Sequence, residues 1–189
     1  MFGWKKDKSD EFMKLAAPVM DSLYGTALKL TREEEAARDL VQDAYLKAFK
    51  YFDTFERGTN FKAWLFRIMT RLFYDAYRAK RRRDSTFMPL EEERAPGNIK
   101  DATAGERLLL SKELEAALNE LPPDFKLPLV LCDIQEFSYQ EIAEVMDVPI
   151  GTVMSRLYRA RKRLREIIVS QDQIRKPGKS YKGGVVIPL

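Results

Sequence analysis

The residues best suited to chemistry lie near the C-terminal end, in the stretch V-P-I-G-T-V-M-S-R-L-Y-R-A-R-K-R-L-R-E at 148–166. Six of the ten residues from Arg156 to Arg165 are Lys or Arg. Aligned cations release counterions from a phosphate backbone, and arginine also makes bidentate hydrogen bonds to guanine edges. A solvated helix face can carry the same charge, so the elements that position these residues must decide between the two interpretations.

A short helix, a tight turn and a longer helix are predicted to carry this basic run. Ser138-Tyr139-Gln140-Glu141 has the spacing of a capping box, which opens a helix with Ile142, Ala143 and Met146 inward. Asp147-Val148-Pro149 then turns the chain into the basic helix. This is the outline of a helix-turn-helix, whose second helix lies in the major groove of DNA.

Periodicity divides the basic helix into a buried stripe and an outer face. Val153, Leu157, Ala160 and Leu164 recur at spacings of three and four and account for the buried stripe. The outer face holds Thr152, Ser155, Arg156, Arg159 and Lys162. Caps, turn, spacing and charge agree with one another, so we favour a DNA-binding face over a merely solvated one.

A second candidate surface follows the turn E-R-G-T-N at 56–60. Exposed rings stack on bases of single-stranded DNA while cations follow the phosphates. Trp64 shares an inward stripe with Ile68, which favours a core position for it. Asn60 suits a base edge and a helix N-cap equally, and both interpretations stay open. The helix after the turn interleaves aromatic and basic residues: Phe61, Trp64, Arg67, Phe73, Tyr74, Tyr77 and Arg78.

Helical periodicity accounts for nearly the whole chain and predicts an all-α fold. The first half reads as a helix over 11–30 kinked at Pro18, a capping box at 31–34 that starts a second helix, and a third helix over 61–83. The inward residues expected of the third helix are Phe61, Trp64, Leu65, Ile68, Leu72 and Ala76.

The pattern stops at 84–105, where two prolines, a glycine and an acidic run indicate a flexible linker. Helical spacing then resumes, with a break at Pro122-Pro123. The chain is therefore predicted to hold two small helical domains. Basic residues predominate before and after an acidic stretch at 91–125.

The composition excludes much enzymology. The 189 residues include no histidine and one cysteine, which excludes a histidine-based triad, a Cys/His zinc site and an internal disulfide. No carboxylate pair has the spacing of acid–base or metal chemistry, so we expect no enzyme, no cofactor and no metal. Cys132, in L-V-L-C-D-I, is expected to be a buried, inert thiol.

The sequence also bears on location. No window approaches the roughly 18 uninterrupted apolar residues of a membrane span, and Met1 to Asp10 lacks the apolar stretch of a signal peptide. We therefore expect a cytoplasmic protein that does not insert into membranes.

Four stretches occur in the order D-L-V-Q-D-A-Y-L-K-A-F (39–49), F-K-A-W-L-F-R-I (61–68), S-Y-Q-E-I-A-E-V-M (138–146) and V-P-I-G-T-V-M-S-R-L-Y-R-A-R-K-R-L (148–164). Together they resemble a bacterial RNA polymerase sigma factor of the extracytoplasmic-function type. The resemblance implies region 2 at 10–83, the linker at 84–105 and region 4 at 106–170. The basic tail at 171–189 lies outside it and is expected to be flexible.

The same resemblance implies partners: core RNA polymerase, promoter DNA with its minus-ten and minus-thirty-five elements, and an anti-sigma factor. By this resemblance Asp39, Gln42 and Asp43 match the surface that binds the polymerase clamp. The loop at 56–61 matches the one that captures a flipped base of the non-template strand.

The resemblance also implies two sets of DNA contacts, and two residues depart from the family pattern. Arg71 stands where the family usually has Asn, and Met154 stands where many members have Arg. The minus-ten candidates are Asn60, Phe61, Arg67, Arg71 and Arg78. The minus-thirty-five candidates are Thr152, Ser155, Arg156, Tyr158, Arg159 and Lys162.

Two other functions are compatible with a helix-turn-helix. One is a transcription regulator that binds an operator by itself as a dimer, which leaves the motifs at 39–68 unexplained. The other is a carboxylate–metal nuclease with a DNA-binding tail, which cleavage of plasmid DNA with magnesium would reveal.

Overall fold

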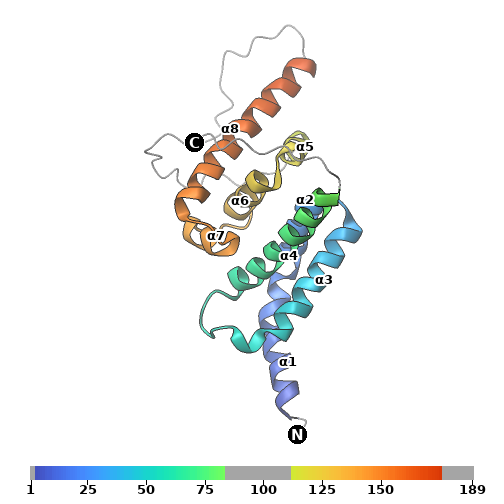
Figure 1. Ribbon diagram of the computed structural model, residues 1–189, viewed down its shortest axis with the longest axis vertical. Coiled ribbons are helices and arrows are strands. Elements are labelled where there is room, and N and C mark those ends of the chain that lie inside the picture. Colours follow the sequence, from blue (N-terminus) through green and yellow to red (C-terminus); the bar gives the residue numbers. More distant parts are fainter. Residues whose placement is uncertain (1–2, 84–111, 176–189) are drawn as a thin grey trace. The chain divides into compact units, whose positions relative to one another are not determined.

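The computed structural model describes residues 3–83 and 112–175, and these residues form helices and the turns between them. The predicted all-α class is confirmed, whereas the predicted linker at 84–105 lies outside the described residues. The helices in chain order are α1 (Gly3–Ala16), η1 (Ala17–Val19), α2 (Met20–Thr31), α3 (Glu34–Lys50), η2 (Phe52–Thr54), α4 (Phe61–Arg83), α5 (Lys112–Glu120), α6 (Pro123–Asp133), α7 (Tyr139–Met146) and α8 (Ile150–Arg175) (Figure 1).

The chain divides into two compact units. Among the described residues, one unit consists of 3–83 with Ala143–Val148, and the other of 112–142 with 149–175. Helix α8 continues to Arg175, so the first five residues of the expected tail at 171–189 are helical. The rest of that tail lies outside the described residues.

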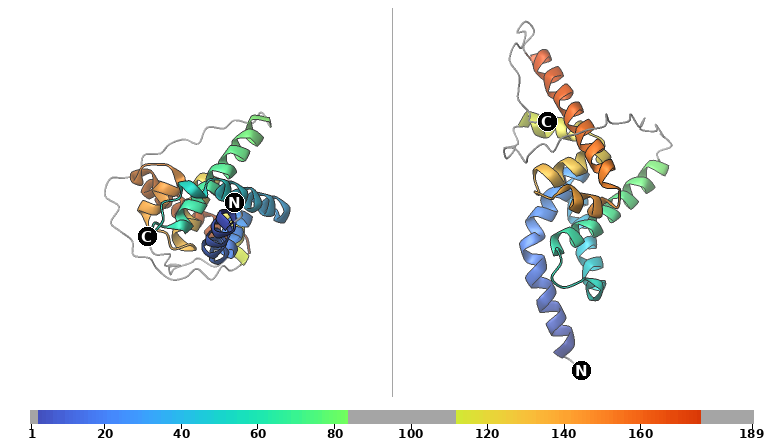
Figure 2. Two further views of the ribbon diagram at one scale, coloured as in Figure 1. Left: turned by 90° about the horizontal axis from the view of Figure 1, so that it is seen from below. Right: turned by 90° about the vertical axis from the view of Figure 1, so that its left-hand side faces the viewer.

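In the first unit, α3 packs against both α2 and α4, and α1 reaches α4 (Figure 2). Three alanines of α3, Ala37, Ala44 and Ala48, are fully buried, and side chains this small let the neighbouring helices approach closely. Pairs of aromatic rings join α1, η2 and α4. For example, the ring centroids of Phe12 and Phe52 lie 5.3 Å apart. Each such aromatic pair stabilises by about 0.5–1.5 kcal/mol beyond its buried area.

The helix ends in the first unit confirm one prediction and correct another. Pro18 lies in the short η1 turn between α1 and α2, which confirms the predicted kink. The capping box at 31–34 is wrong, because Thr31 completes α2 and its hydroxyl donates to the carbonyls of Ala27 and Glu33. Arg32 turns the chain with a left-handed φ of 66°, and α3 begins only at Glu34, without a side-chain cap.

The buried face of α4 is rotated from the predicted stripe. Phe61 and Leu65 are buried as predicted, but Ala76 is exposed, and Trp64, Ile68 and Leu72 are only half-buried. The buried residues of the helix are Phe61, Ala63, Leu65, Phe66, Met69, Thr70 and Phe73. Apolar residues are abundant on several sides of α4, so periodicity alone does not select the face that packs.

In the second unit, α8 packs against α5 and α6. Every residue of α6 from Phe125 to Leu131 is buried, including Lys126, whose ammonium donates to Asn119 Oδ1 at 3.3 Å. Burying a charged group is costly unless it is hydrogen-bonded, and this contact supplies a partner. On α8 the predicted stripe Val153, Leu157, Ala160 and Leu164 is buried, as expected.

Candidate nucleic-acid interface

The predicted capping box at Ser138 is confirmed. Ser138 Oγ accepts from the Glu141 N–H at 3.3 Å, and the Glu141 carboxylate accepts from the Ser138 N–H at 2.8 Å. After α7, Asp147 adopts a φ of 57° and the Val148 N–H donates to the Ala143 carbonyl at 3.1 Å, which closes the turn. The helix, the turn and the second helix thus form where the sequence predicted them.

The predicted DNA contacts of α8 are less exposed than helical periodicity suggests. Lys162 is exposed, whereas the others are half-buried: Thr152, Ser155, Arg156, Tyr158 and Arg159. Two of the arginines are oriented by contacts with helix α6. The Arg156 guanidinium lies 3.9 Å from the Asp124 carboxylate, and that of Arg159 lies over the Phe125 ring, 5.8 Å from its centroid.

Arg159 is further held within its own helix. Its Nε donates to the Ser155 carbonyl at 3.2 Å, and its terminal nitrogen donates to Ser155 Oγ at 3.1 Å. A guanidinium held in this way loses less side-chain entropy when it binds a base or phosphate. Sequence reasoning missed Asp124 and Phe125 as orienting residues, because they contact α8 from about thirty residues earlier in the chain.

A second ion pair fastens α8 to the end of α6. Arg161 donates to Asp133 Oδ1 at 2.9 Å and approaches the Cys132 sulfur at 3.7 Å. Burial by itself lowers the pKa of Arg161, but the charge of Asp133 and hydrogen bonds to Tyr139 and Asp133 raise that pKa overall. Arg161 therefore anchors the helix, and it lies away from the candidate DNA face.

Cys132 is half-buried, and the structure favours the expected inert thiol. Burial and the neighbouring charge of Asp133 raise its pKa to about 11. Little thiolate therefore forms near neutral pH, and the thiolate is the reactive form.

In the first unit, the loop between η2 and α4 presents Glu56 to Asn60 at the surface. Asn60 Oδ1 accepts from the Ala63 N–H at 3.0 Å, so Asn60 is the N-cap of α4. This bond leaves open whether the same residue also contacts a base, because capping uses the carbonyl oxygen of the amide. Gly58 supports the loop with a φ of 90°, a conformation that is strained for other residues.

Two aromatic residues of the predicted single-strand surface belong to the core. Phe61 is 6% exposed and Phe73 is 7% exposed. The ring centroids of Phe61 and Phe55 lie 5.2 Å apart. These rings are covered and have no open face for stacking on a base. Trp64 is half-buried beside Phe55, at 5.3 Å between ring centroids, an edge position between the core and the surface.

The basic candidates of α4 share one side of the helix. Arg67, Arg71 and Arg78 recur at intervals of four and seven residues, which places them within a narrow arc of the helix circumference. Arg71 and Arg78 are exposed, and Arg67 is half-buried. Arg71, one of the two departures from the family pattern, thus stands on the same side as the other cations.

Two acidic candidates and one amide candidate lie on α3, and all three are exposed: Asp39, Asp43 and Gln42. Their spacing of three and four residues puts them on one side of the helix. The same side continues with Leu46, 62% exposed, and Phe49, 39% exposed. Sequence reasoning missed these two residues. Their spacing could have indicated them, because Leu46 follows Asp43 by three residues and Phe49 follows Gln42 by seven, which places both on the same side of the helix. We call Asp39, Gln42, Asp43, Leu46 and Phe49 the α3 face.

Within the described ranges 3–83 and 112–175, no group of three or more Cys, Asp or Glu side chains is arranged to hold a metal ion. No helix in that part of the chain is long and apolar enough to cross a membrane.

Two family models match the chain. "Sigma-70 region 2" matches residues 15–83, and "Sigma-70, region 4" matches residues 111–164. The first therefore covers α2 to α4 with the α3 face and the η2–α4 loop, and the second covers α5 to α7 and most of the basic run on α8.

Several curated proteins are similar over much of the chain. The ECF RNA polymerase sigma factor SigE of Mycolicibacterium smegmatis is 36% identical over 155 residues, which cover 80% of this chain and 59% of that protein. The ECF RNA polymerase sigma factor EcfG of Rhodopseudomonas palustris is 35% identical, covering 78% of this chain and 79% of its own length. The ECF RNA polymerase sigma-E factor of Escherichia coli K12 is 35% identical, and the match covers 66% of this chain and 69% of that protein.

A solved structure is also similar. The sigma factor RpoE of Bartonella quintana, crystallised in complex with the anti-sigma factor NepR, has 34% sequence identity and a TM-score of 0.66, covering 84% of this chain and 97% of that one. The structure of CnrH in complex with the cytosolic domain of CnrY has 23% identity and a TM-score of 0.60, a likeness of fold.

Proposed function

This chain belongs to the sigma-70 family, as an RNA polymerase sigma factor of the extracytoplasmic-function type, and on that premise we propose how its parts divide the work. Residues 10–83 bind core polymerase and recognise and melt the minus-ten element. Residues 106–170 recognise the minus-thirty-five element, and 84–105 connect the two. Because core polymerase is the partner, the site of action is the cytoplasm.

The observation that carries this assignment is the pair of separate surfaces on one chain. A capped helix, a turn with a left-handed residue and a basic helix have the form that places side chains in the major groove. Arg156, Arg159 and Lys162 then contact bases or phosphates of the minus-thirty-five element. The half-buried arginines are pre-oriented, so their cost of ordering is small.

The α3 face is proposed as the surface that binds the polymerase clamp. Its exposed Leu46 and Phe49 beside Asp39, Gln42 and Asp43 combine an apolar contact with a polar, acidic border. Protein interfaces typically have this arrangement of an apolar centre and a polar rim. The carboxylates complement a basic partner and give the contact its orientation.

The minus-ten element is assigned to the η2–α4 loop and to one side of α4. Asn60 and Trp64 border the loop, and Arg67, Arg71 and Arg78 continue along the helix as cations for the phosphate backbone. Unpairing a base costs a few kcal/mol, which contacts in the loop must offset. An anti-sigma factor is proposed as a regulatory partner, because the similar RpoE was crystallised with one.

Reconstitution tests the proposed function. Purified core RNA polymerase of the source bacterium is mixed with the full-length chain and a pool of linear DNA templates randomised over 40 base pairs upstream of a reporter sequence, about four helical turns. The sigma assignment expects run-off transcripts that depend on the chain and derive from templates sharing two sequence elements. Transcripts that are equal with and without the chain would contradict it.

The same pool distinguishes the dimeric regulator and the nuclease. A self-sufficient regulator would bind particular templates from the pool in the absence of polymerase. The motifs of region 2 would have no role in that binding. A nuclease would degrade the templates when magnesium is added. We expect neither result, and no described group of carboxylates supports the second.

A further inference from the structure

The η2–α4 loop is exposed along its length. Its ends are fixed by the buried Phe55 and Phe61, but every residue between them is exposed. Within the loop, the Thr59 N–H and hydroxyl donate to the Glu56 carbonyl, at 3.2 Å and 2.7 Å. Short exposed loops sample several conformations unless contacts with another segment hold them.

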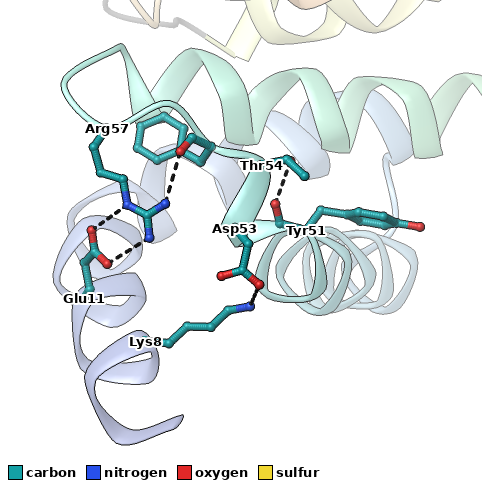
Figure 3. A network of polar contacts seen from close by, with 7 residues as sticks. Lys8, Glu11, Tyr51, Asp53, Thr54 and Arg57 are labelled. Atoms are coloured by element: carbon teal, nitrogen blue, oxygen red, sulfur yellow. Dashed lines mark hydrogen bonds and ion pairs between the residues drawn. The ribbon is translucent and has the colours of Figure 1, made fainter. Parts of the chain in front are cut away.

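Helix α1 supplies that second segment (Figure 3). The Arg57 guanidinium forms a two-point contact with the Glu11 carboxylate, with Nε to Oε1 and a terminal nitrogen to Oε2 both at 3.2 Å. One turn earlier on α1, the Lys8 ammonium pairs with the Asp53 carboxylate in η2. The start of the loop is thus tied to a helix more than forty residues away in sequence.

Arg57 is also fixed by its own surroundings. Its guanidinium lies 5.0 Å from the centroid of the buried Phe52 ring and donates to the Phe55 carbonyl at 3.4 Å. A planar cation held on a ring and bonded at two points to a carboxylate has a defined orientation. Arg57 therefore transmits the position of α1 to the loop backbone.

The contact is suited to positioning and contributes little to the folding of the unit. The Arg57 and Glu11 side chains are 50% and 42% exposed, and exposed ion pairs contribute little to global stability. The entropy cost of DNA binding is a different quantity from the stability of the fold. Each loop residue that is free before binding must become ordered when DNA binds, and this ordering costs free energy. Loss of the pair should affect base selection while the fold stays intact.

We propose that Glu11 is a positioning residue for promoter recognition, which acts through Arg57 to hold the η2–α4 loop in the geometry that receives a base of the minus-ten element. This inference rests on the proposed assignment of that loop. Lys8 and Asp53 support the same arrangement from the η2 side of the loop.

The test measures base selection with the full chain and core polymerase. Two templates are chosen from the transcribed pool, one with the preferred minus-ten base and one with that base replaced, and the ratio of their open-complex formation rates is the readout. The variants are Glu11→Gln, Arg57→Gln, Glu11→Arg and the exchange Glu11→Arg with Arg57→Glu. Asp10→Asn is the matched control, because it removes one negative charge from an exposed neighbouring position of the same helix.

We expect Glu11→Gln and Arg57→Gln to lower the ratio about fivefold, Asp10→Asn to leave it unchanged, and the exchange to recover more of it than Glu11→Arg alone. Circular dichroism and melting temperature should match wild type in each case. An unchanged or raised ratio for Glu11→Gln would overturn the inference, as would an equal loss of rate on both templates. A wild-type chain that gives no promoter-dependent transcription would contradict the proposed function instead, which separates the two failures.

Discussion

The guanidinium of Arg161 lies 2.9 Å from the carboxylate of Asp133, and this ion pair joins the basic helix α8 to the end of α6. The two side chains are 16% and 25% exposed, so they are more shielded from water than the Arg156–Asp124 pair, and they lie close enough for a charge-assisted hydrogen bond. The direction in which α8 leaves the core therefore depends on a polar contact as well as on its apolar stripe.

Asp133→Ala should destabilise the second unit by about 2 kcal/mol, because it leaves the partly buried guanidinium of Arg161 without its carboxylate, a cost between those of surface and fully buried pairs. Both tryptophans, Trp4 and Trp64, precede residue 84, so their fluorescence reports on the first unit while circular dichroism reports on both. In urea unfolding, we expect the circular dichroism transition to shift and the fluorescence transition to stay. The control Glu34→Ala, which breaks the exposed Arg38 pair, should change stability by less than about 0.5 kcal/mol.

Cys132 should react slowly with alkylating agents in the folded protein. Burial raises its thiol pKa from 9.0 to about 11, so the thiolate fraction at pH 8 falls about a hundredfold relative to an unperturbed thiol. Iodoacetamide labelling followed by mass spectrometry should show this ratio between the native chain and the chain in urea. Because the folded state retains the thiol proton that the unfolded state loses, stability should decline as pH rises from about 9 to 11. Equal labelling rates in both states would contradict the prediction.

Reversing two charges on the α3 face should abolish polymerase binding. Asp39→Lys with Asp43→Lys replaces attraction for a basic partner with repulsion, at a cost of several kcal/mol, while both positions are exposed and contribute little to the fold. The measurements are co-purification with core polymerase and run-off transcription. Asp10→Lys with Glu136→Lys is the control, because it changes the net charge equally at two exposed positions outside α3. Undiminished polymerase binding by the first pair would refute the assignment.

Asn60→Ser should separate capping from base contact. Serine caps a helix about as well as asparagine, so melting of the first unit should change by less than about 0.5 kcal/mol. The amide donors are lost, and if they bond a base, discrimination at one minus-ten position should fall about tenfold, as for other direct base contacts. Asn60→Ala, which also removes the cap acceptor used by the Ala63 N–H, should lower stability by about 1 kcal/mol in addition. Unchanged discrimination with Asn60→Ser would leave Asn60 a cap alone.

Arg159→Ala should weaken minus-thirty-five binding by about 1–3 kcal/mol and relax sequence preference if this guanidinium bonds a base. Lys162→Ala, at an exposed position of α8, should instead weaken binding to all sequences and lower the salt dependence by about one counterion. Titration of selected templates with the polymerase holoenzyme at several salt concentrations distinguishes the two. Lys14→Ala, an exposed cation of α1, is the control. No loss for Arg159→Ala on any DNA would place the contact surface on another side of α8.

The sequence pattern was sufficient to predict the structure at places where the decisive interactions lie within one helix or one turn. The Ser138–Glu141 cap joins residues three apart, and the stripe from Val153 to Leu164 follows from helical geometry alone. The exposure of Asp39 and Asp43 also agrees with helical geometry, because they lie on the side of α3 away from the buried Ala37, Ala44 and Ala48.

Two features were not determined by the local sequence pattern. The sequence from Phe61 to Ala76 has apolar residues on several sides of α4, and contacts with the other helices selected the side with Phe66, Met69 and Phe73. Thr31 has the spacing of an N-cap, but it completes α2 instead, because the chain turns at Arg32. In both places the local pattern admits more than one arrangement, and the structure shows which one forms.

The side-chain partners of the candidate sites were likewise determined by tertiary structure. The sequence alone determined that a basic helix and an exposed turn exist, and it left Asn60 open between a cap and a base contact. Only the fold brought Phe125 under Arg159 and Glu11 to Arg57, across 46 residues. Helix patterns arise from neighbours three and four residues apart, whereas such contacts depend on how separate helices pack, which one-dimensional spacing does not encode.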